Sequence, residues 1–81
     1  MSTVTVQLFA SYAEVFGNSK LEVALQDGGT VADLIKSIRS LPAGSGLPDS
    51  PRVAVNRKLV LSDHLVASSD EIALIPPVAG G

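Results

Sequence analysis

The sequence contains no cysteine and no tryptophan among its 81 residues. The lack of cysteine excludes disulfides, thiolate metal sites and a cysteine nucleophile. Aromatic side chains are scarce, with only Phe9, Tyr12 and Phe16, so valine, leucine, isoleucine and alanine must fill the core. Because 46% of the residues are hydrophobic and 17% are charged, the composition is typical of one small globular domain and not of a disordered chain.

The sequence also lacks a large excess of charge of one sign and any long apolar run. The formal net charge is −2, and the lysines and arginines are spread along the chain, whereas nucleic-acid binding requires a concentrated basic surface. No apolar run approaches the roughly 20 residues needed to cross a bilayer. The start, Met1 to Val4, lacks the basic head and apolar stretch of a signal peptide. We therefore expect no nucleic-acid partner, no membrane association and a cytoplasmic location.

Alternation of apolar and polar residues predicts several short strands. In residues 3–10, Val4, Val6 and Leu8 share one face, which is the period of a half-buried strand. The same alternation places Phe9 on the opposite face. Further strands are predicted by similar patterns over residues 21–25, 52–56, 59–61 and 71–75.

One long helix is predicted between the second and third strands. Thr30 is a suitable N-cap with Asp33 in the first turn, and the helix should stop before Pro42. Its apolar stripe, at helical spacing, comprises Val31, Leu34, Ile35, Ile38 and Leu41. A short helical turn is predicted over residues 11–16, and a loop rich in proline, glycine and serine over residues 42–51.

The order of these elements is β, β, α, β, β, β. It predicts the α+β class, with a mixed sheet of about five strands and one main helix packed across a single face. This is the β-grasp, or ubiquitin-like, plan. We expect a β-grasp domain over residues 1–75 and an extended Gly-Gly tail over residues 76–81.

The predicted tail carries the candidate chemistry. Pro76 and Pro77 cannot donate hydrogen bonds to a sheet and favour a stiff, extended course, and Gly80 and Gly81 have no Cβ to clash with the walls of a narrow tunnel. The Gly81 carboxylate is ionised at neutral pH. It can attack ATP to form an acyl-adenylate, which sulfur from a persulfide converts to a thiocarboxylate. A terminal Gly-Gly can also be mere fraying, but its place after a β-grasp pattern and a Pro-Pro pair favours the chemical interpretation.

Several segments resemble a known family. Residues 70–81, ending in Pro-Pro-Val-Ala-Gly-Gly, resemble the closing segment of the MoaD family, the small subunit of molybdopterin synthase. Residues 8–10 and 53–56 resemble that family's first and middle strands, and Glu14 and Gly17 fall where the family usually has an acidic residue and a glycine. The resemblance spans nearly the whole chain.

The resemblance implies a role for the terminus. In the family the terminal glycine, here Gly81, is adenylated by an E1-like, ATP-dependent partner and converted to a thiocarboxylate, and Gly80 belongs to the tail that enters the large subunit. The sulfur is donated to cyclic pyranopterin monophosphate to build the dithiolene that binds molybdenum. The family complex is a heterotetramer whose catalytic residues lie in the large subunit. We therefore expect that the chain is not an enzyme on its own and binds no cofactor. ATP is expected to be used by the activating partner.

Partner docking is predicted on the face of the sheet that the helix leaves open. Phe9 and Ile75 both point away from the helix by strand parity, on the first and last strands, which are neighbours in a β-grasp. Leaving large apolar side chains exposed indicates that a partner covers them. The predicted docking residues are Phe9, Leu59, Ile75, Pro76, Pro77 and Val78.

Other polar residues are assigned no chemical role. Arg52, Arg57 and Lys58 form a loose basic group, which we interpret as a solvated face, with contact to an acidic partner surface as the alternative. His64 has no cysteine or second histidine beside it, so we expect no metal site. The adjacent Asp70 and Glu71 point opposite ways on a strand and do not form an acid–base pair.

Three alternatives remain open from the sequence. The first is another β-grasp sulfur carrier, serving thiamine thiazole, cysteine or tRNA thiolation, although the Pro-Pro before the terminus favours the pterin pathway. The second is a ubiquitin-like modifier that links Gly81 to lysines of other proteins. The third is a structural domain with a frayed end.

Overall fold

The computed structural model describes residues 2–48 and 51–76. Within these ranges the chain forms five strands, two α-helices and one short 3-10 helix. In chain order they are β1 (Ser2–Leu8), α1 (Ala10–Phe16), β2 (Lys20–Leu25), α2 (Val31–Arg39), η1 (Gly44–Gly46), β3 (Arg52–Val55), β4 (Lys58–Val60) and β5 (Ile72–Ile75). The predicted α+β class and β-grasp plan are confirmed.

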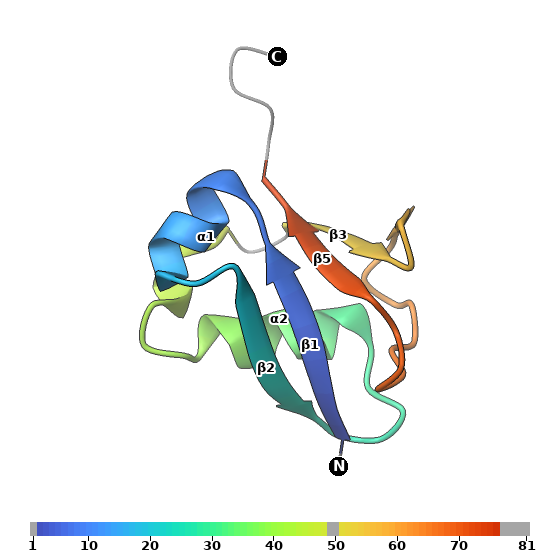
Figure 1. Cartoon of the computed structure of the whole chain (residues 1–81). Coiled ribbons are helices and arrows are strands. Elements are labelled where there is room, and N and C mark those ends of the chain that lie inside the picture. The colour runs from blue at the N-terminus through green and yellow to red at the C-terminus, as the bar shows by residue number, and fades with distance from the viewer. Residues whose placement is uncertain (1, 49–50, 77–81) are drawn as a thin grey trace.

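The strands form one mixed sheet in the order β2-β1-β5-β3-β4. The central strand β5 runs parallel to β1, with Leu8 opposite Leu74, and antiparallel to β3. Strands β2 and β4 form the two edges and pair antiparallel with their neighbours. Figure 1 shows α2 crossing one face of this sheet. Because β1 and β5 are parallel, their C-terminal ends lie at the same end of the sheet.

The hydrophobic core lies between α2 and the sheet. Four side chains of the predicted helical stripe are buried: Val31, Leu34, Ile35 and Ile38. They share the core with alternate side chains of four strands, which are Val4, Val6, Leu8, Val23, Leu25, Val53, Val55, Ile72 and Leu74. Leu47 and Val66, which lie between the regular elements, are also members of the core.

The N-terminus of α2 is capped as the sequence predicts. Thr30 Oγ1 accepts a hydrogen bond from the Asp33 N–H at 3.3 Å, and Asp33 Oδ2 accepts one from the Thr30 N–H at 3.0 Å. Two further N–H groups of the first turn, those of Val31 and Ala32, donate to the carbonyls of His64 and Ser62. The segment between β4 and β5 therefore satisfies donors that a helix start leaves without partners.

The C-terminus of α2 comes earlier than the apolar stripe predicts. The helix ends at Arg39, and Leu41 lies outside it, half-buried. A Cβ on Gly44 would meet the carbonyl oxygens of Ile38 and Arg39. The loop thus folds tightly back over the last turn, and that fold-back stops the helix before Leu41.

The first strand is also shorter than predicted. It ends at Leu8, so the placement of Phe9 on that strand is wrong: Phe9 is the N-cap residue of α1. The cause is local hydrogen bonding, because the Phe9 carbonyl accepts from the N–H groups of Tyr12 and Ala13. The backbone turns at Ala10, which has a φ of 46°, and the helix follows.

Candidate docking groove and tail exit

The open face of the sheet has a row of small side chains at its centre. The strand register aligns Gln7 of β1 with Ala73 of β5, Ala73 with Ala54 of β3, and Ala54 with Leu59 of β4. Alternation along the strands directs these residues away from the face that packs on α2. Two alanines between larger neighbours leave a shallow groove of about 420 Å³. We call it the docking groove; it is lined by Gln7, Phe9, Ala54, Arg57, Leu59, Glu71, Ala73 and Ile75.

Three of the predicted docking residues meet in this groove. Phe9 is 45% exposed and Leu59 is 63% exposed, while Ile75 is half-buried. They come from the start of α1, from β4 and from β5, so residues far apart in the sequence form one apolar surface. Their position agrees with the predicted face, although Phe9 reaches it from the N-cap of α1. Their role in docking stays a prediction.

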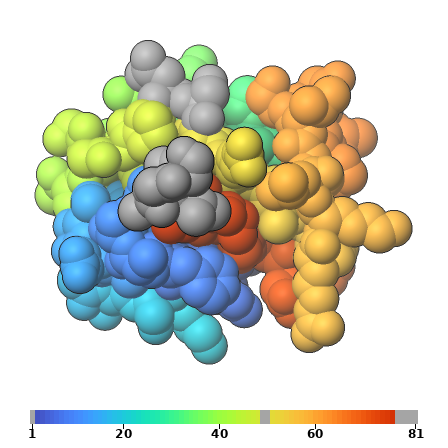
Figure 2. Space-filling view, turned by 90° about the horizontal axis from the view of Figure 1, so that it is seen from above, coloured from blue at the N-terminus to red at the C-terminus, as the bar shows by residue number. Residues whose placement is uncertain are grey.

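The described chain leaves the sheet beside this groove. Ile75 is the last residue of the central strand, and the half-buried Pro76 follows it. Figure 2 looks onto this end of the molecule and shows the red end of β5 between the blue residues that follow β1 and the yellow residues of β3. The other predicted tail residues, Pro77, Val78, Gly80 and Gly81, lie outside the described residues. The described chain thus ends, at Pro76, next to the docking groove.

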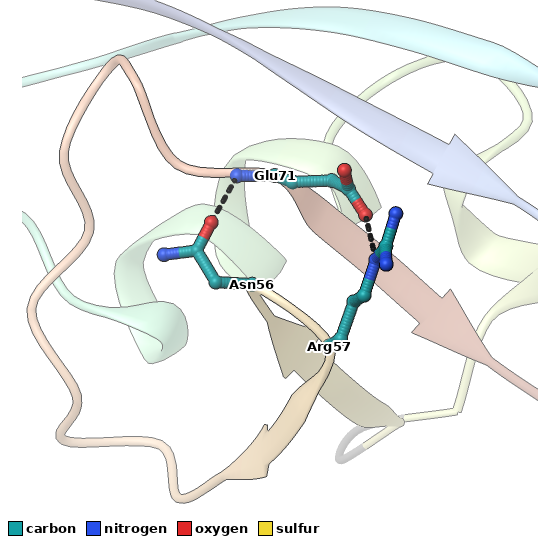
Figure 3. A network of polar contacts seen from close by, with 3 residues as sticks. All are labelled: Asn56, Arg57 and Glu71. Carbon is teal, nitrogen blue, oxygen red and sulfur yellow. Dashed lines mark hydrogen bonds and ion pairs between the residues drawn. The ribbon is translucent and has the colours of Figure 1, made fainter.

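One rim of the groove is fixed by hydrogen bonds from the β3–β4 turn. Asn56 Oδ1 accepts from the Glu71 N–H at 2.9 Å, and the Asn56 N–H donates to the Glu71 carbonyl at 2.8 Å. Asn56 Nδ2 donates to Asp70 Oδ1 at 3.0 Å. Beside these hydrogen bonds of Asn56, Arg57 Nε lies 3.7 Å from Glu71 Oε2 (Figure 3). The turn and the start of β5 are therefore held as one unit.

Asp70 has a structural role that the sequence did not reveal. Its carboxylate accepts the Ala67 N–H at 2.8 Å as well as the Asn56 amide. The hydrogen bond from the Ala67 backbone, followed by that from the Asn56 side chain, holds the pKa of Asp70 below its ordinary value. Asp70 thus closes the turn that leads into β5.

Sequence reasoning missed the floor and the polar rim of the groove. Ala54 and Ala73 gave no signal by size or charge, and Arg57 was assigned to a solvated basic group. The available signal was strand parity, since Ala54 and Ala73 alternate with the buried Val53, Val55, Ile72 and Leu74. Small residues on the strand face that no helix covers, opposite a row of large buried ones, indicate a hollow surface.

The described residues contain no cluster of side chains that could hold a metal ion. No group of three or more histidine, aspartate or glutamate side chains comes together in residues 2–48 and 51–76. In the same ranges no helix is long and apolar enough to pass through a bilayer. What the described residues form at this end of the sheet is a largely apolar groove next to Ile75 and Pro76.

Comparison with known proteins identifies the family. The model of the ThiS family matches residues 6–81, which include the whole of the tail. The chain belongs to the ThiS family. Its β-grasp fold is the ubiquitin-like fold shared by ThiS- and MoaD-type proteins and by the small archaeal modifiers.

Two curated relatives of this ThiS-family chain match along nearly its full length. It is 35% identical over 80 residues to a molybdopterin synthase sulfur carrier subunit of Dictyostelium discoideum, covering 94% of this chain and 93% of that protein. It is 31% identical over 84 residues to small archaeal modifier protein 1 of Haloferax volcanii, covering 93% of this chain and 97% of that protein. The resemblance to the MoaD family is thereby confirmed.

Solved structures show the same fold. The crystal structure of the Haloferax volcanii modifier superposes with a TM-score of 0.81 at 31% identity, covering 99% of this chain and all of that one. A putative molybdopterin converting factor subunit 1 from Pyrococcus furiosus gives a TM-score of 0.81 at 25% identity, covering 96% and 100% of the two chains. Carrier-type and modifier-type relatives thus resemble this ThiS-family chain about equally in backbone.

Proposed function

We propose that this chain is the sulfur carrier subunit of a molybdopterin synthase. The observation that carries the proposal is where the last strand ends: β5 ends at Ile75, which lines an apolar groove, and Pro76 follows it. A partner that covers the groove receives, at the same time, the chain end that leads to Gly81. The names of the Dictyostelium and Pyrococcus relatives support the molybdopterin assignment.

The chemistry takes place at the Gly81 carboxylate. One carboxylate oxygen attacks the α-phosphorus of ATP, and pyrophosphate leaves with the formation of an acyl-adenylate. The terminal sulfur of a partner's persulfide then attacks the carbonyl carbon and displaces AMP. A second thiol of the partner cleaves the resulting S–S bond, which leaves a thiocarboxylate on Gly81 and a disulfide on the partner. ATP is consumed by the activating partner, and this chain binds no cofactor of its own.

Two partners follow from this chemistry. The first is an E1-like adenylyltransferase that charges Gly81. The second is the large subunit of molybdopterin synthase, in a heterotetramer of two small and two large subunits, whose active site receives the tail and transfers sulfur to cyclic pyranopterin monophosphate. On this account the chain acts as a sulfur-donating co-substrate, and the catalytic residues belong to the large subunit.

A second function is supported by the relationship to the archaeal modifier. That protein is 31% identical to this chain, and a modifier function would link the activated Gly81 to a lysine amine of another protein instead of to sulfur. Both functions use the same tail and the same activation. They differ in the nucleophile that the partner supplies, which the docking groove does not determine.

A reconstituted assay tests the proposed function. The chain is prepared with a C-terminal thiocarboxylate by semisynthesis and mixed with the large subunit of its own organism and cyclic pyranopterin monophosphate. We expect dithiolene to form in proportion to the thiocarboxylate added, while the same chain with an ordinary carboxylate gives none. If no dithiolene forms, and the activated chain instead appears in lysine-linked adducts of cell proteins, the modifier function replaces the carrier function.

A further inference from the structure

The turn between β3 and β4 places a large side chain where the backbone favours glycine. Asn56 has a φ of 53° and Arg57 a φ of 71°, and the two residues join Val55 directly to its partner Lys58. This is the two-residue turn whose second position is preferentially glycine, because both central residues need a positive φ. Arg57 therefore occupies its position at a cost in stability, and such strain concentrates at functional sites.

The Arg57 side chain gains little within its own molecule. It is 87% exposed, and its contact to the half-exposed carboxylate of Glu71 runs through Nε at 3.7 Å. An exposed ion pair at that distance contributes little to folding. Figure 3 shows this contact through Nε. The two Nη groups form the fork that binds carboxylates in a bidentate manner.

The backbone of the turn that carries Arg57 is nevertheless held firmly at the rim of the docking groove. Asn56, its neighbour, makes hydrogen bonds to both the N–H and the carbonyl of Glu71. Arg57 and Glu71 both line the groove, together with the apolar Leu59 and Ala73. The turn backbone that carries Arg57 is thus fixed at the edge of an apolar hollow, and the exposed guanidinium lies at that edge.

We propose that Arg57 determines which partner the docking groove accepts, by pairing with a carboxylate on that partner. The matching segment carries an apolar side chain that fills the hollow over Ala54 and Ala73, with an aspartate or glutamate placed to meet the Arg57 guanidinium. This proposal rests on the docking role assigned to the groove under the proposed function. It adds a charge requirement to a surface otherwise defined by apolar contact.

Replacing Arg57 with glycine separates function from stability. Arg57→Gly relieves the backbone strain, so its melting temperature should be equal to or above that of the original chain. The same variant should bind the large subunit about fivefold more weakly, as is typical for the loss of one interfacial charge partner. If Arg57 has only a structural role, Arg57→Gly should not weaken binding. A stability that stays the same or rises together with a loss of affinity is therefore expected only if the proposal holds.

Matched variants isolate the charge. Arg57→Gln should lose binding as Arg57→Gly does, and Arg57→Lys should recover part of it, because lysine keeps the charge without the bidentate fork. Arg52→Gln removes an exposed positive charge that does not line the docking groove, and it should change affinity by less than about twofold. Raising the salt concentration should narrow the difference between the original chain and Arg57→Gln.

The measurement is the dissociation constant for the large subunit by calorimetry, with Phe9→Asp as a reference for the apolar surface. If Phe9→Asp weakens binding to the large subunit and Arg57→Gln does not, the Arg57 proposal is overturned and the proposed function remains intact. If the original chain does not bind the large subunit, the proposed function fails, and the same variants are measured against the activating enzyme. Equal affinities of the original chain and Arg57→Gln there would overturn the Arg57 proposal as well.

Discussion

Gly44 is the described glycine at which an added Cβ would meet the closest backbone contact. A Cβ at this position would meet the backbone carbonyls of Ile38 and Arg39 at the end of α2, and backbone atoms cannot turn aside as a flexible side chain can. The contact also explains why the stripe that the sequence predicts to Leu41 is cut short at Arg39. A glycine in a loop rich in proline and serine gave no hint of this packing.

We predict that Gly44→Ala destabilises the domain. Forcing a methyl group against the helix end should lower the free energy of unfolding by about 1–3 kcal/mol, and thermal denaturation followed by circular dichroism measures the change. Ser45→Ala, at the exposed next position, is the matched control and should be nearly neutral. Equal melting temperatures for the two variants would contradict the close approach.

Asp70 predicts a pH dependence. Its pKa is lowered in the folded chain, chiefly by the Ala67 N–H and then by Asn56, so its contribution to stability is present above the ordinary pKa of an aspartate. That contribution is lost as the pH falls through the lowered value, below about pH 4. Asp70→Asn should therefore melt at a lower temperature than the original chain at pH 7, and the gap should close on acidification. A gap that stays constant to pH 2 would show that Asp70 does not act through its charge.

At the scale of elements, α2 shows what a sequence pattern can predict. Its start, its buried face and its capping box all follow from local spacing, since Thr30, Asp33 and the stripe are close neighbours along the chain. The short η1 helix depends on contacts with α1 and α2. The end of β1 at Leu8 depends on the turn at Ala10 and on the hydrogen bonds that the Phe9 carbonyl accepts. Alternation alone carries no information on such contacts, which is why Phe9 was assigned to a strand.

The capping box of α2 provides a test at this scale. Thr30→Ala removes the hydroxyl that accepts the Asp33 N–H, and loss of such a cap costs about 0.5–2 kcal/mol. For a domain of this size that corresponds to a fall in melting temperature of several degrees, about 4–8 °C per kcal/mol. Thr30→Ser keeps the hydroxyl and should retain most of the stability. If serine and alanine are equally destabilising, the side-chain methyl and not the cap is responsible.

For the whole molecule, the position of the end of β5 follows from the topology. A parallel pair of β1 and β5 at the centre of the sheet brings the end of the last strand next to Phe9. The order of elements predicted the fold, and strand parity predicted an apolar open face. Strand parity places Ala54 and Ala73 on the open face, but their alignment with Gln7 and Leu59 depends on the register of four strands.

Phe9 tests the docking groove without disturbing the core. Phe9 is 45% exposed, so Phe9→Asp places a charge on the apolar surface of the groove. An aspartate at the N-cap of α1 is also favourable for that helix. The melting temperature should therefore stay the same or rise. Association with the large subunit should weaken by about tenfold or more, because burying a large apolar side chain contributes about 1.5–3 kcal/mol. Unfolding of this variant would show that Phe9 belongs to the core.

The central claim, that Gly81 carries sulfur as a thiocarboxylate, is tested most directly by intact-mass spectrometry. The chain is incubated with the activating enzyme of its own organism, ATP and a persulfide sulfur donor, beside a variant that lacks Gly81. The account predicts a mass increase equal to the exchange of one oxygen for one sulfur, located in the C-terminal peptide of the original chain and absent from the shortened variant. An unchanged mass in the original chain, or the same increase in the variant without Gly81, would contradict it.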